Sequence, residues 1–192
     1  MQVTRAPFVG TLLVVGLGLL LGGCVSVPWQ PTAGLYSSPA ENFAVELPQG
    51  WMRLNVNEDL LITRDGLLLQ HVSVERAAVD RPLKSTKKTL ARGMQPQAVA
   101  EVIIDSLQSS ERLLEVKVLE NRPVQVAQNR GFRLVYTHRD KNGLRFKSVM
   151  HGFLAGDVFY SIRYTAAERY YFAKDLPAYE QVLASFRLIR PA

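Results

Sequence analysis

Hydrophobic and polar positions alternate with a period of two across the middle of the chain, and this pattern predicts three neighbouring β-strands. The expected strands cover Gly131–Arg139, Leu144–Leu154 and Val158–Thr165. Between them lie Lys141-Asn142-Gly143 and Gly156-Asp157, which are typical of tight turns. The three strands are therefore expected to form an antiparallel meander.

The turn at Asn142-Gly143 determines which face each side chain of the meander occupies, because side chains alternate between the two faces of a sheet. A two-residue turn there sets Tyr136 opposite Val149, and the second turn sets Phe153 opposite Tyr160. One face of the meander is then expected to be apolar and aromatic. Its members are Phe132, Leu134, Tyr136, Val149, Phe153, Tyr160, Ile162 and Tyr164.

Further strands are predicted before the meander. Alternation over Phe43–Leu47 indicates a half-buried strand, and Leu60–Thr63 and Leu67–Glu75 indicate a hairpin around an intervening Asp-Gly turn. Val116–Val126 also has strand character. Pro123 lies within it and cannot donate a ladder hydrogen bond, which favours a position at a sheet edge or an interruption of the strand.

Two segments show the three-and-four spacing of apolar residues that predicts helices. The first covers residues 97–109 and follows Pro96, which suits the first turn of a helix. The second runs from Phe172 to Phe186. Pro177 disfavours helical backbone at the residue before it, so it is expected to begin a separate helical segment. Residues 187–189 are expected to form a short extended end.

The chain begins with an apolar run over residues 6–23, preceded by Arg5 and ending in small residues. This order is the pattern of a secretory signal. Its last residues, Leu21-Gly22-Gly23-Cys24, resemble the lipobox of bacterial lipoproteins. The resemblance implies that the chain is cut before Cys24, that the thiol of this cysteine carries a diacylglycerol, and that its new amine is acylated.

An uncleaved transmembrane anchor is the alternative interpretation, because an apolar run over residues 6–23 just suffices to span a bilayer. Arg5 favours a cytoplasmic N-terminus, so both interpretations place the rest of the chain outside the cytoplasm. Val25 and Ser26 follow the cysteine, with no Asp beside it. In the sorting rule of enterobacterial lipoproteins this implies the outer membrane rather than the inner one, facing the periplasm.

The sequence divides into three parts by composition. We predict a signal peptide over residues 1–23, a lipidated cysteine with a flexible Pro-, Gly- and Ser-containing tether over residues 24–40, and a single α/β globular domain over residues 41–192. Cys24 is the only cysteine of the chain, so the predicted domain can form no disulfide and no thiolate metal site.

Three segments together resemble a known family. They are Phe43–Trp51, in which a strand is closed by Pro-x-Gly-Trp, the aromatic meander, and Tyr179–Phe186, which ends in Ser-Phe. This layout resembles the Mog1/PsbP-like α/β/α sandwich, including the bacterial DcrB-like lipoproteins. The resemblance implies the α+β class, with a mainly antiparallel β-sheet and helices packed on its faces. Members bind partner proteins or assist assemblies, and the family offers no catalytic motif to transfer.

Two groups of basic residues are candidate binding sites. Arg133, Arg139 and Arg163 are expected on one mixed face of the meander, where they suit a carboxylate, a phosphate or an acidic peptide. Salt bridging to a covering helix, or simple exposure, is the alternative. A dense group in the chain, formed by Lys84, Lys87, Lys88 and Arg92, suits anionic lipid headgroups or an acidic partner; the alternative is a solvated face.

The three histidines do not suggest a metal site. In the expected register His138 and His151 lie about 14 Å apart along the strands, too far to share one ion. His151 is expected to be a core histidine with one hydrogen bond. No nucleophile elbow, zinc-binding helix motif, phosphate loop or dinucleotide fingerprint is present in the sequence.

The leading hypothesis is a membrane-anchored, non-catalytic lipoprotein that binds an envelope protein through its folded domain, with no cofactor and no metal. A small-ligand or lipid-binding protein with an anionic-ligand site near Arg133 and Arg163 is the main alternative, and a hydrolase is a third. The net charge is +6, but the expected export of the chain and the absence of a recognised binding motif argue against nucleic acid as a partner.

Overall fold

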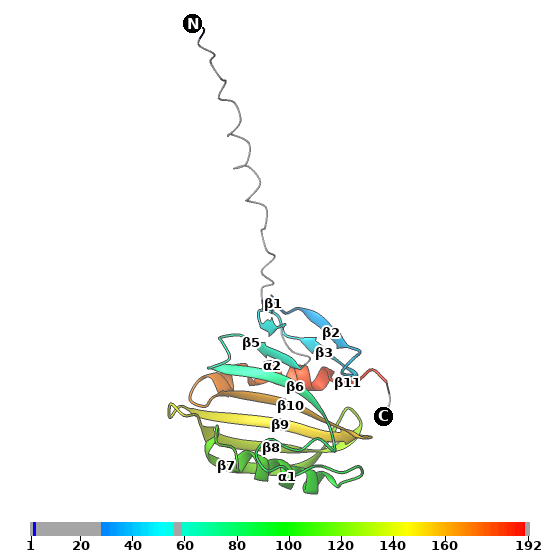
Figure 1. Cartoon of the computed structure of the whole chain (residues 1–192). Coiled ribbons are helices and arrows are strands. Elements are labelled where there is room, and N and C mark those ends of the chain that lie inside the picture. The colour runs from blue at the N-terminus through cyan, green and yellow to red at the C-terminus, as the bar shows by residue number, and fades with distance from the viewer. Residues whose placement is uncertain (1, 3–27, 56–58, 191–192) are drawn as a thin grey trace.

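The computed structural model of the protein describes residue 2 and residues 28–55 and 59–190. The described chain folds into eleven strands and two helices, which Figure 1 shows in order. Their bounds are β1 (Trp29–Pro31), β2 (Gly34–Ser38), β3 (Phe43–Leu47), β4 (Met52–Leu54), β5 (Leu60–Thr63), β6 (Gln70–Ala78), α1 (Pro96–Gln108), β7 (Leu114–Val126), β8 (Asn129–Arg139), β9 (Arg145–Ala155), β10 (Val158–Ala167), α2 (Tyr171–Ser185) and β11 (Arg187–Leu188).

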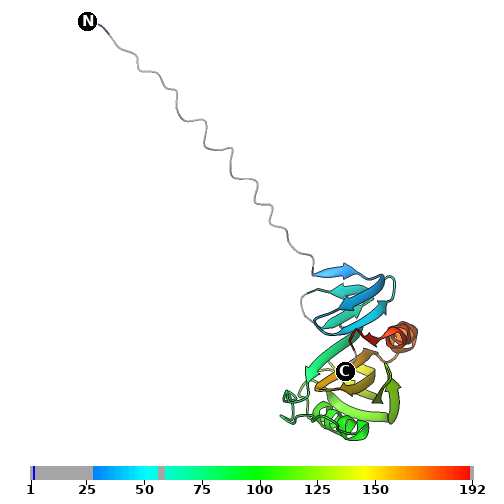
Figure 2. The same cartoon turned by 90° about the vertical axis from the view of Figure 1, so that its right-hand side faces the viewer.

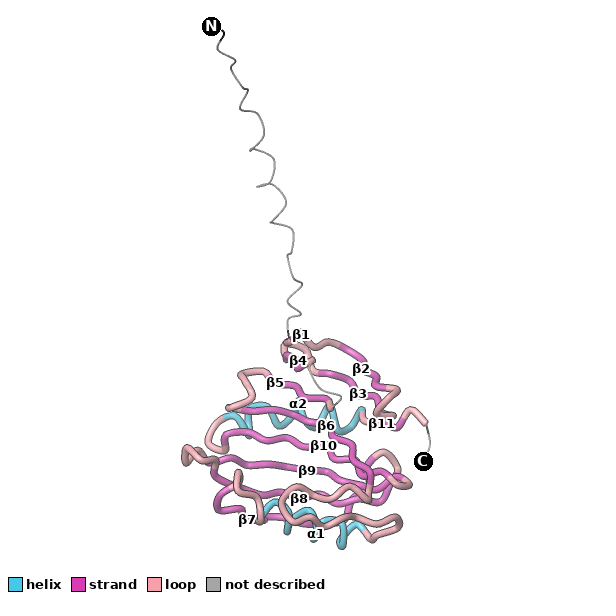
Figure 3. The backbone as a smooth tube through the Cα atoms, in the orientation of Figure 1, coloured by secondary structure: helices cyan, strands magenta, loops and turns pink. Residues whose placement is uncertain are grey.

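The strands form two antiparallel sheets. The large sheet has the strand order β1-β4-β5-β6-β10-β9-β8-β7, and the small sheet has the order β11-β3-β2. Helix α1 packs on β7, β8 and β9, whereas α2 packs on β3, β6 and β10. Figures 2 and 3 show the two helices on different sides of the central strands. We refer to the two surfaces of the large sheet as the α1-side face and the α2-side face. This α+β architecture confirms the predicted fold class.

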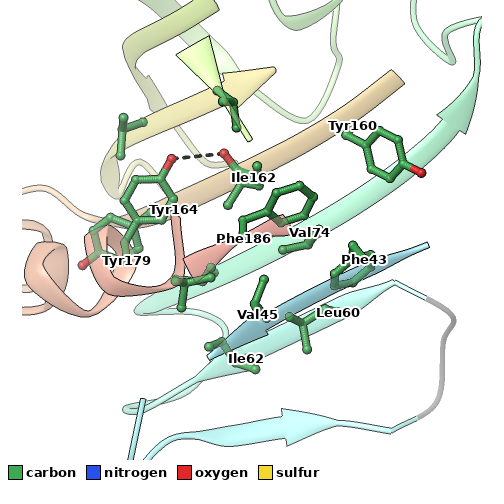
Figure 4. Packing of buried hydrophobic residues seen from close by; sticks show 14 of the residues in the cluster. Phe43, Val45, Leu60, Ile62, Val74, Tyr160, Ile162, Tyr164, Tyr179 and Phe186 are labelled. Atoms are coloured by element: carbon green, nitrogen blue, oxygen red, sulfur yellow. Dashed lines mark hydrogen bonds between the residues drawn. The ribbon is translucent and has the colours of Figure 1, made fainter. Parts of the chain in front are cut away.

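The main hydrophobic core lies between the α2-side face, the small sheet and α2. Trp51 is buried there, as are Phe153, Tyr160 and Phe186, whose rings contact one another. Figure 4 shows how residues from β3, β5, β6, β10 and α2 converge on this cluster. A smaller cluster lies under α1, and it contains Phe132, Leu134, Tyr136, Met150 and Phe159 together with apolar residues of the helix.

The predicted pairing of β8 with β9 is wrong by one residue. Val135, not Tyr136, lies opposite Val149, and Arg139 pairs with Arg145. A one-residue slip moves every side chain of a strand to the other face. Phe132, Leu134 and Tyr136 therefore belong to the α1-side cluster, apart from Phe153 and Tyr160.

The cause of the slip is the loop between the two strands. Asp140 accepts hydrogen bonds from the backbone N–H groups of Asn142 (3.0 Å) and Leu144 (2.8 Å). These bonds stabilise a five-residue loop over residues 140–144 in place of the expected two-residue turn. The pairing of β9 with β10 follows the prediction, with Phe153 opposite Tyr160 and Val149 opposite Tyr164.

Part of the predicted tether is folded. Strand β1 pairs with β4, and β2 pairs with β3, so the described chain is built into the domain from Trp29 onward rather than from Glu41. Thr32 strengthens this attachment, because its buried hydroxyl donates a hydrogen bond to the carbonyl oxygen of Pro48 at 2.5 Å. The expectation of a flexible segment failed here because each strand finds its partner outside the segment itself.

The remaining elements follow the pattern of the sequence with two further corrections. The second strand of the predicted hairpin begins at Gln70 rather than at Leu67, because residues 67–69 form a turn. Pro123 lies in β7, which is an edge strand of the large sheet, as predicted. The predicted break at Pro177 is absent, because α2 is continuous through this exposed residue. Phe172 and Tyr179 are buried on either side of the proline. Their packing holds the helix together against the roughly 3 kcal/mol cost of an interior proline.

Candidate functional site

A cleft opens on the α1-side face, because α1 covers β7–β9 and leaves part of β6 and β10 uncovered. Its volume is about 370 Å³, which lies within the range of small-ligand sites. The segment after β6, residues 81–84, forms one wall, and Ile103, Ser106 and Leu107 of α1 form the other. Met150 and Phe159 supply apolar surface at the sheet.

Charged side chains line this apolar cleft. Arg163 of β10 donates a hydrogen bond from a terminal guanidinium nitrogen to Glu75 of β6 at 2.5 Å, and the hydroxyl of Ser73 donates to the same carboxylate at 3.0 Å. The Nε atom of Arg163 is buried and has no hydrogen-bond partner among the described residues. A quarter of the Arg163 side chain remains exposed in the cleft after its pairing with Glu75.

Basic residues outnumber acidic ones around the cleft. Arg76, Arg81, Lys84 and Arg163 carry positive charge, against Glu75 and Asp59. Arg76 lies 3.8 Å from a carboxylate oxygen of Glu41, which is a long ion pair. Arg81 and Lys84 form no ion pair with any residue that the structure describes. The rim consequently has a local excess of positive charge.

The other members of the dense basic group lie beside this rim, on the segment that follows Lys84. Lys88 pairs with Asp105 of α1 at 2.8 Å, and Arg92 forms a bidentate pair with Asp157 in the β9–β10 turn. These two pairs tie the segment to its neighbours. Lys87 is exposed and has no ion-pair partner within residues 28–55 and 59–190, so it extends the positive charge of the rim.

A row of polar side chains continues along the α1-side face beyond the cleft. The hydroxyls of Ser148 and Thr165 are 2.9 Å apart and buried. Burial, and then the charge of Arg163, lower the pKa of His71 to about 4 and also lower the pKa of His138. Both imidazoles are therefore neutral at pH 7. Arg163 is the fixed positive charge at the centre of this face.

On the α2-side face, His151 is a core histidine. Its Nδ1 atom lies 2.6 Å from the hydroxyl of Tyr179, and that hydroxyl donates to the carbonyl oxygen of Ile162 at 3.1 Å. The phenol oxygen thus links the buried imidazole to the backbone of β10. The prediction of a buried histidine with one hydrogen bond is confirmed.

The expectation that Arg133, Arg139 and Arg163 share one face is wrong. The shift of β8 puts Arg133 opposite His151, on the α2-side face, and Arg139 alternates onto that face as well. Both are paired to β7, Arg133 with Glu120 and Arg139 with Glu115 at 2.9 Å. Of the three arginines, Arg163 is the one that lies on the α1-side face, in the cleft.

Several cleft residues were not singled out from the sequence, among them Glu75, Arg81 and Ser106. Arg81 lies three positions before Lys84. It could therefore have been found by extending the dense basic group toward the N-terminus. Glu75 and Ser106 come to line the same cleft only through tertiary packing.

Cys24 and the expected signal peptide lie outside the described residues. Within the part of the chain that the structure describes, no cluster of three His, Cys, Asp or Glu side chains suits a metal ion, and no helix is long and apolar enough to cross a membrane.

Comparisons with known proteins bear on the fold. No family model matches the chain, and no curated protein matches its sequence. Among solved structures it is similar to cyanobacterial PsbP from Synechocystis, with 15% identity, a TM-score of 0.58, and coverage of 88% of this chain and 98% of that one. It is also similar to the Ran-binding protein Mog1p of Saccharomyces cerevisiae, with 11% identity, a TM-score of 0.53, and coverage of 83% and 97%.

A third similar structure is a protein of unknown function from Pseudomonas aeruginosa, a putative regulator in its own description. It has 15% identity, a TM-score of 0.51, and coverage of 84% of this chain and 99% of that one. The chain thus has a Mog1/PsbP-like fold, as the sequence motifs suggested. At these identities the likeness concerns the fold alone.

Proposed function

We propose that this protein is a lipid-anchored, non-catalytic binding module of the bacterial cell envelope, and that it holds a protein partner on its α1-side face. The cleft beside α1 is the observation that carries the proposal, because it combines apolar surface with cations that have no partner in the described chain. The fold supports it, since the similar protein Mog1p is a Ran-binding protein. The lipobox-like Leu21-Gly22-Gly23-Cys24 supports the anchor.

The observed strands constrain how such an anchor would present the domain. Four residues lie between Cys24 and Trp29, where β1 begins, so five residue steps join them. Even a fully extended chain of that length reaches at most about 17 Å. A lipid on Cys24 would therefore hold the β1 edge of the large sheet close to the membrane. β7 forms the opposite edge, and α1 packs on β7–β9, so α1 would face away from the membrane toward soluble or integral envelope partners.

A small anionic ligand is the second candidate, and the volume of the cleft favours it. About 370 Å³ lies in the range for small molecules, and Arg163 provides a guanidinium for a carboxylate or phosphate. Under this alternative a purified, unmodified protein would retain or bind a compound of low molecular mass without any protein partner.

Two experiments on the full chain test the proposal. Cys24→Ser should remove incorporation of a fatty-acid analogue and leave an unprocessed precursor, because the thiol is the acyl acceptor; equal label on the variant excludes the anchor. Crosslinking of the wild-type lipoprotein in intact membranes, followed by purification, should yield a defined protein adduct. A chain that remains uncrosslinked while carrying a small molecule supports the second candidate.

A further inference from the structure

The positively charged side chains around the cleft come from different elements rather than from one point. Their spread limits which ligands can contact several of them. Arg163 lies at the sheet, Arg81 and Lys84 lie in the wall, and Lys87 extends the same segment. A single carboxylate or phosphate cannot reach all of these groups at once. An extended ligand with several negative charges can, and each contact adds to the attraction.

The apolar part of the cleft is limited in size and open at the side. Phe159 and Met150 provide it from the sheet, and Leu107 provides it from α1. An acyl chain needs a long enclosed cavity to leave water, whereas one aromatic or aliphatic side chain fits a site of about 370 Å³. The apolar surface therefore suits one anchoring side chain rather than a lipid tail.

Building on the proposed function, the geometry points to the α1-side cleft as a docking site for an acidic peptide segment of a partner protein, with one hydrophobic side chain held between several carboxylates. The hydrophobic side chain enters against Phe159, and the flanking carboxylates meet Arg81 and Lys84. The Arg163 side chain, which is partly exposed in the cleft, meets a further carboxylate beside the anchor.

Glu75 has a defined part in this arrangement. Its carboxylate accepts hydrogen bonds from Arg163 and Ser73, so it competes with an incoming acidic group for the same guanidinium. It also lowers the net positive charge of the empty cleft. Neutralising Glu75 should therefore strengthen binding of an acidic segment, the opposite of the effect of reversing a rim cation.

The test uses the full-length lipoprotein in a neutral detergent and two fluorescein-labelled peptides. One peptide is Glu-Asp-Glu-Phe-Glu-Asp-Glu, and in the other every carboxylate is replaced by its amide. The acidic peptide should bind at least about tenfold more tightly, and its affinity should fall with added salt. Replacing its Phe by Gly should also weaken binding, by about tenfold.

Variants of the protein give the matched comparison. The double variant Arg81→Glu/Lys84→Glu should lower the affinity for the acidic peptide by about tenfold or more. Glu75→Gln should raise this affinity by about threefold. The control is Lys141→Glu/Arg169→Glu, which makes the same change of charge at exposed residues of other loops and should shift the affinity by less than about threefold. Circular dichroism checks that all variants are folded.

Three outcomes overturn the inference: equal affinity for the acidic and amide peptides, equal weakening by the two double variants, or binding of neither peptide. Preferential binding of the wild-type protein to phosphatidylglycerol vesicles, lost in Arg81→Glu/Lys84→Glu, would assign the cleft to a lipid headgroup instead. Each of these leaves the proposed function standing if membrane crosslinking still captures a partner protein. Peptide binding without any captured partner contradicts the proposed function alone.

Discussion

The two faces of the large sheet differ in how completely they are covered: α2 and the small sheet pack over the main core on one face, whereas α1 leaves a cleft open on the other. On the α2-side face His151 is bonded to Tyr179 and Tyr179 to Ile162, whereas the amide of the buried Gln70 has no partner among the described residues. On the α1-side face, α1 covers only part of the sheet, and the partly exposed side chain of Arg163 remains at an open cleft. The first face contributes most of the hydrophobic core, whereas the second leaves charged side chains at an open cleft.

This difference shows where the protein can change without unfolding. Buried, bonded side chains make the α2-side face sensitive to any substitution, because a lost contact or an unpaired polar group destabilises the fold by kilocalories. The cations of the cleft rim contribute little to folding, since exposed ion pairs are weak and Arg81 has none among the described residues. The predictions below begin with the face that should be most sensitive.

Truncation of Phe153 should have the largest effect on stability. Its ring is buried, stacks on Tyr160 at 5.3 Å between ring centroids, and meets Phe186 edge-on at 5.9 Å. Phe153→Ala should lower the free energy of unfolding by about 3–5 kcal/mol, because it removes buried surface and leaves a cavity. Urea denaturation measures the change. A midpoint close to that of the wild type would place the main core elsewhere.

The charge state of His151 provides the second prediction. Burial, followed by the charges of Arg133 and Arg122, lowers its pKa to about 4, and Glu120 only partly opposes this shift. The unfolded state, with a pKa near 6.5, then binds the proton more readily. The free energy of unfolding should fall by about 3 kcal/mol as the pH drops from about 6.5 to about 4.

An NMR titration of the His151 ring measures this pKa directly, and His151→Gln serves as the control in acid denaturation. In the variant the loss of stability between pH 6.5 and pH 4 should be smaller than in the wild type. A titration of the His151 resonance near pH 6.5 in the folded protein would show that its environment is not the dry core described here.

Substitution of Gly152, which lies on the α1-side face, should have an intermediate effect on stability. A Cβ atom there would lie 2.5 Å from Cζ of Phe132 and 3.0 Å from Phe159, whose ring packs against that of Phe132. Gly152→Ala forces these rings to move and should lower the free energy of unfolding by about 1–3 kcal/mol. Thermal denaturation with calorimetry measures the effect. An unchanged melting temperature would mean that the layer under α1 repacks freely.

The smallest effect is expected at the rim of the cleft. Arg81→Glu should change the free energy of unfolding by no more than about 0.5 kcal/mol, because the side chain is exposed and pairs with no described residue. Urea denaturation of this variant, alongside Phe153→Ala, tests the contrast between the faces. A loss of 2 kcal/mol or more (about half the effect of Phe153→Ala) would give the rim cations a structural role.

The local pattern of apolar and polar residues predicted the individual strands and helices better than it predicted their pairing and register. Period-two alternation located β8, β9 and β10, and apolar spacing located α1, because both signals lie within one segment. The register between β8 and β9 failed because Asp140 stabilises a longer loop through its side chain, which outweighed the turn preference of Asn142-Gly143. Strand β1 was missed because its partner is β4, more than twenty residues away.

The candidate site shows the same limit. Arg163 was singled out from its residue type, but it was grouped with Arg133 and Arg139, and that grouping depended on the wrong register. Glu75 and Ser106 reach the cleft from β6 and α1, and no spacing in the sequence links them. A site assembled from a strand, a helix and a connecting segment becomes visible only when their packing is known.

Photocrosslinking from the two faces in intact membranes tests the central claim most directly. The photoreactive residue p-benzoylphenylalanine is placed at Ser106 in the cleft, or at Gln181 on the exposed side of α2. We predict one defined protein adduct from Ser106, greatly reduced when Arg81→Glu is added, and none from Gln181. An adduct formed from Gln181 alone, or one from Ser106 that Arg81→Glu leaves unchanged, would contradict the assignment of the α1-side cleft as the binding surface.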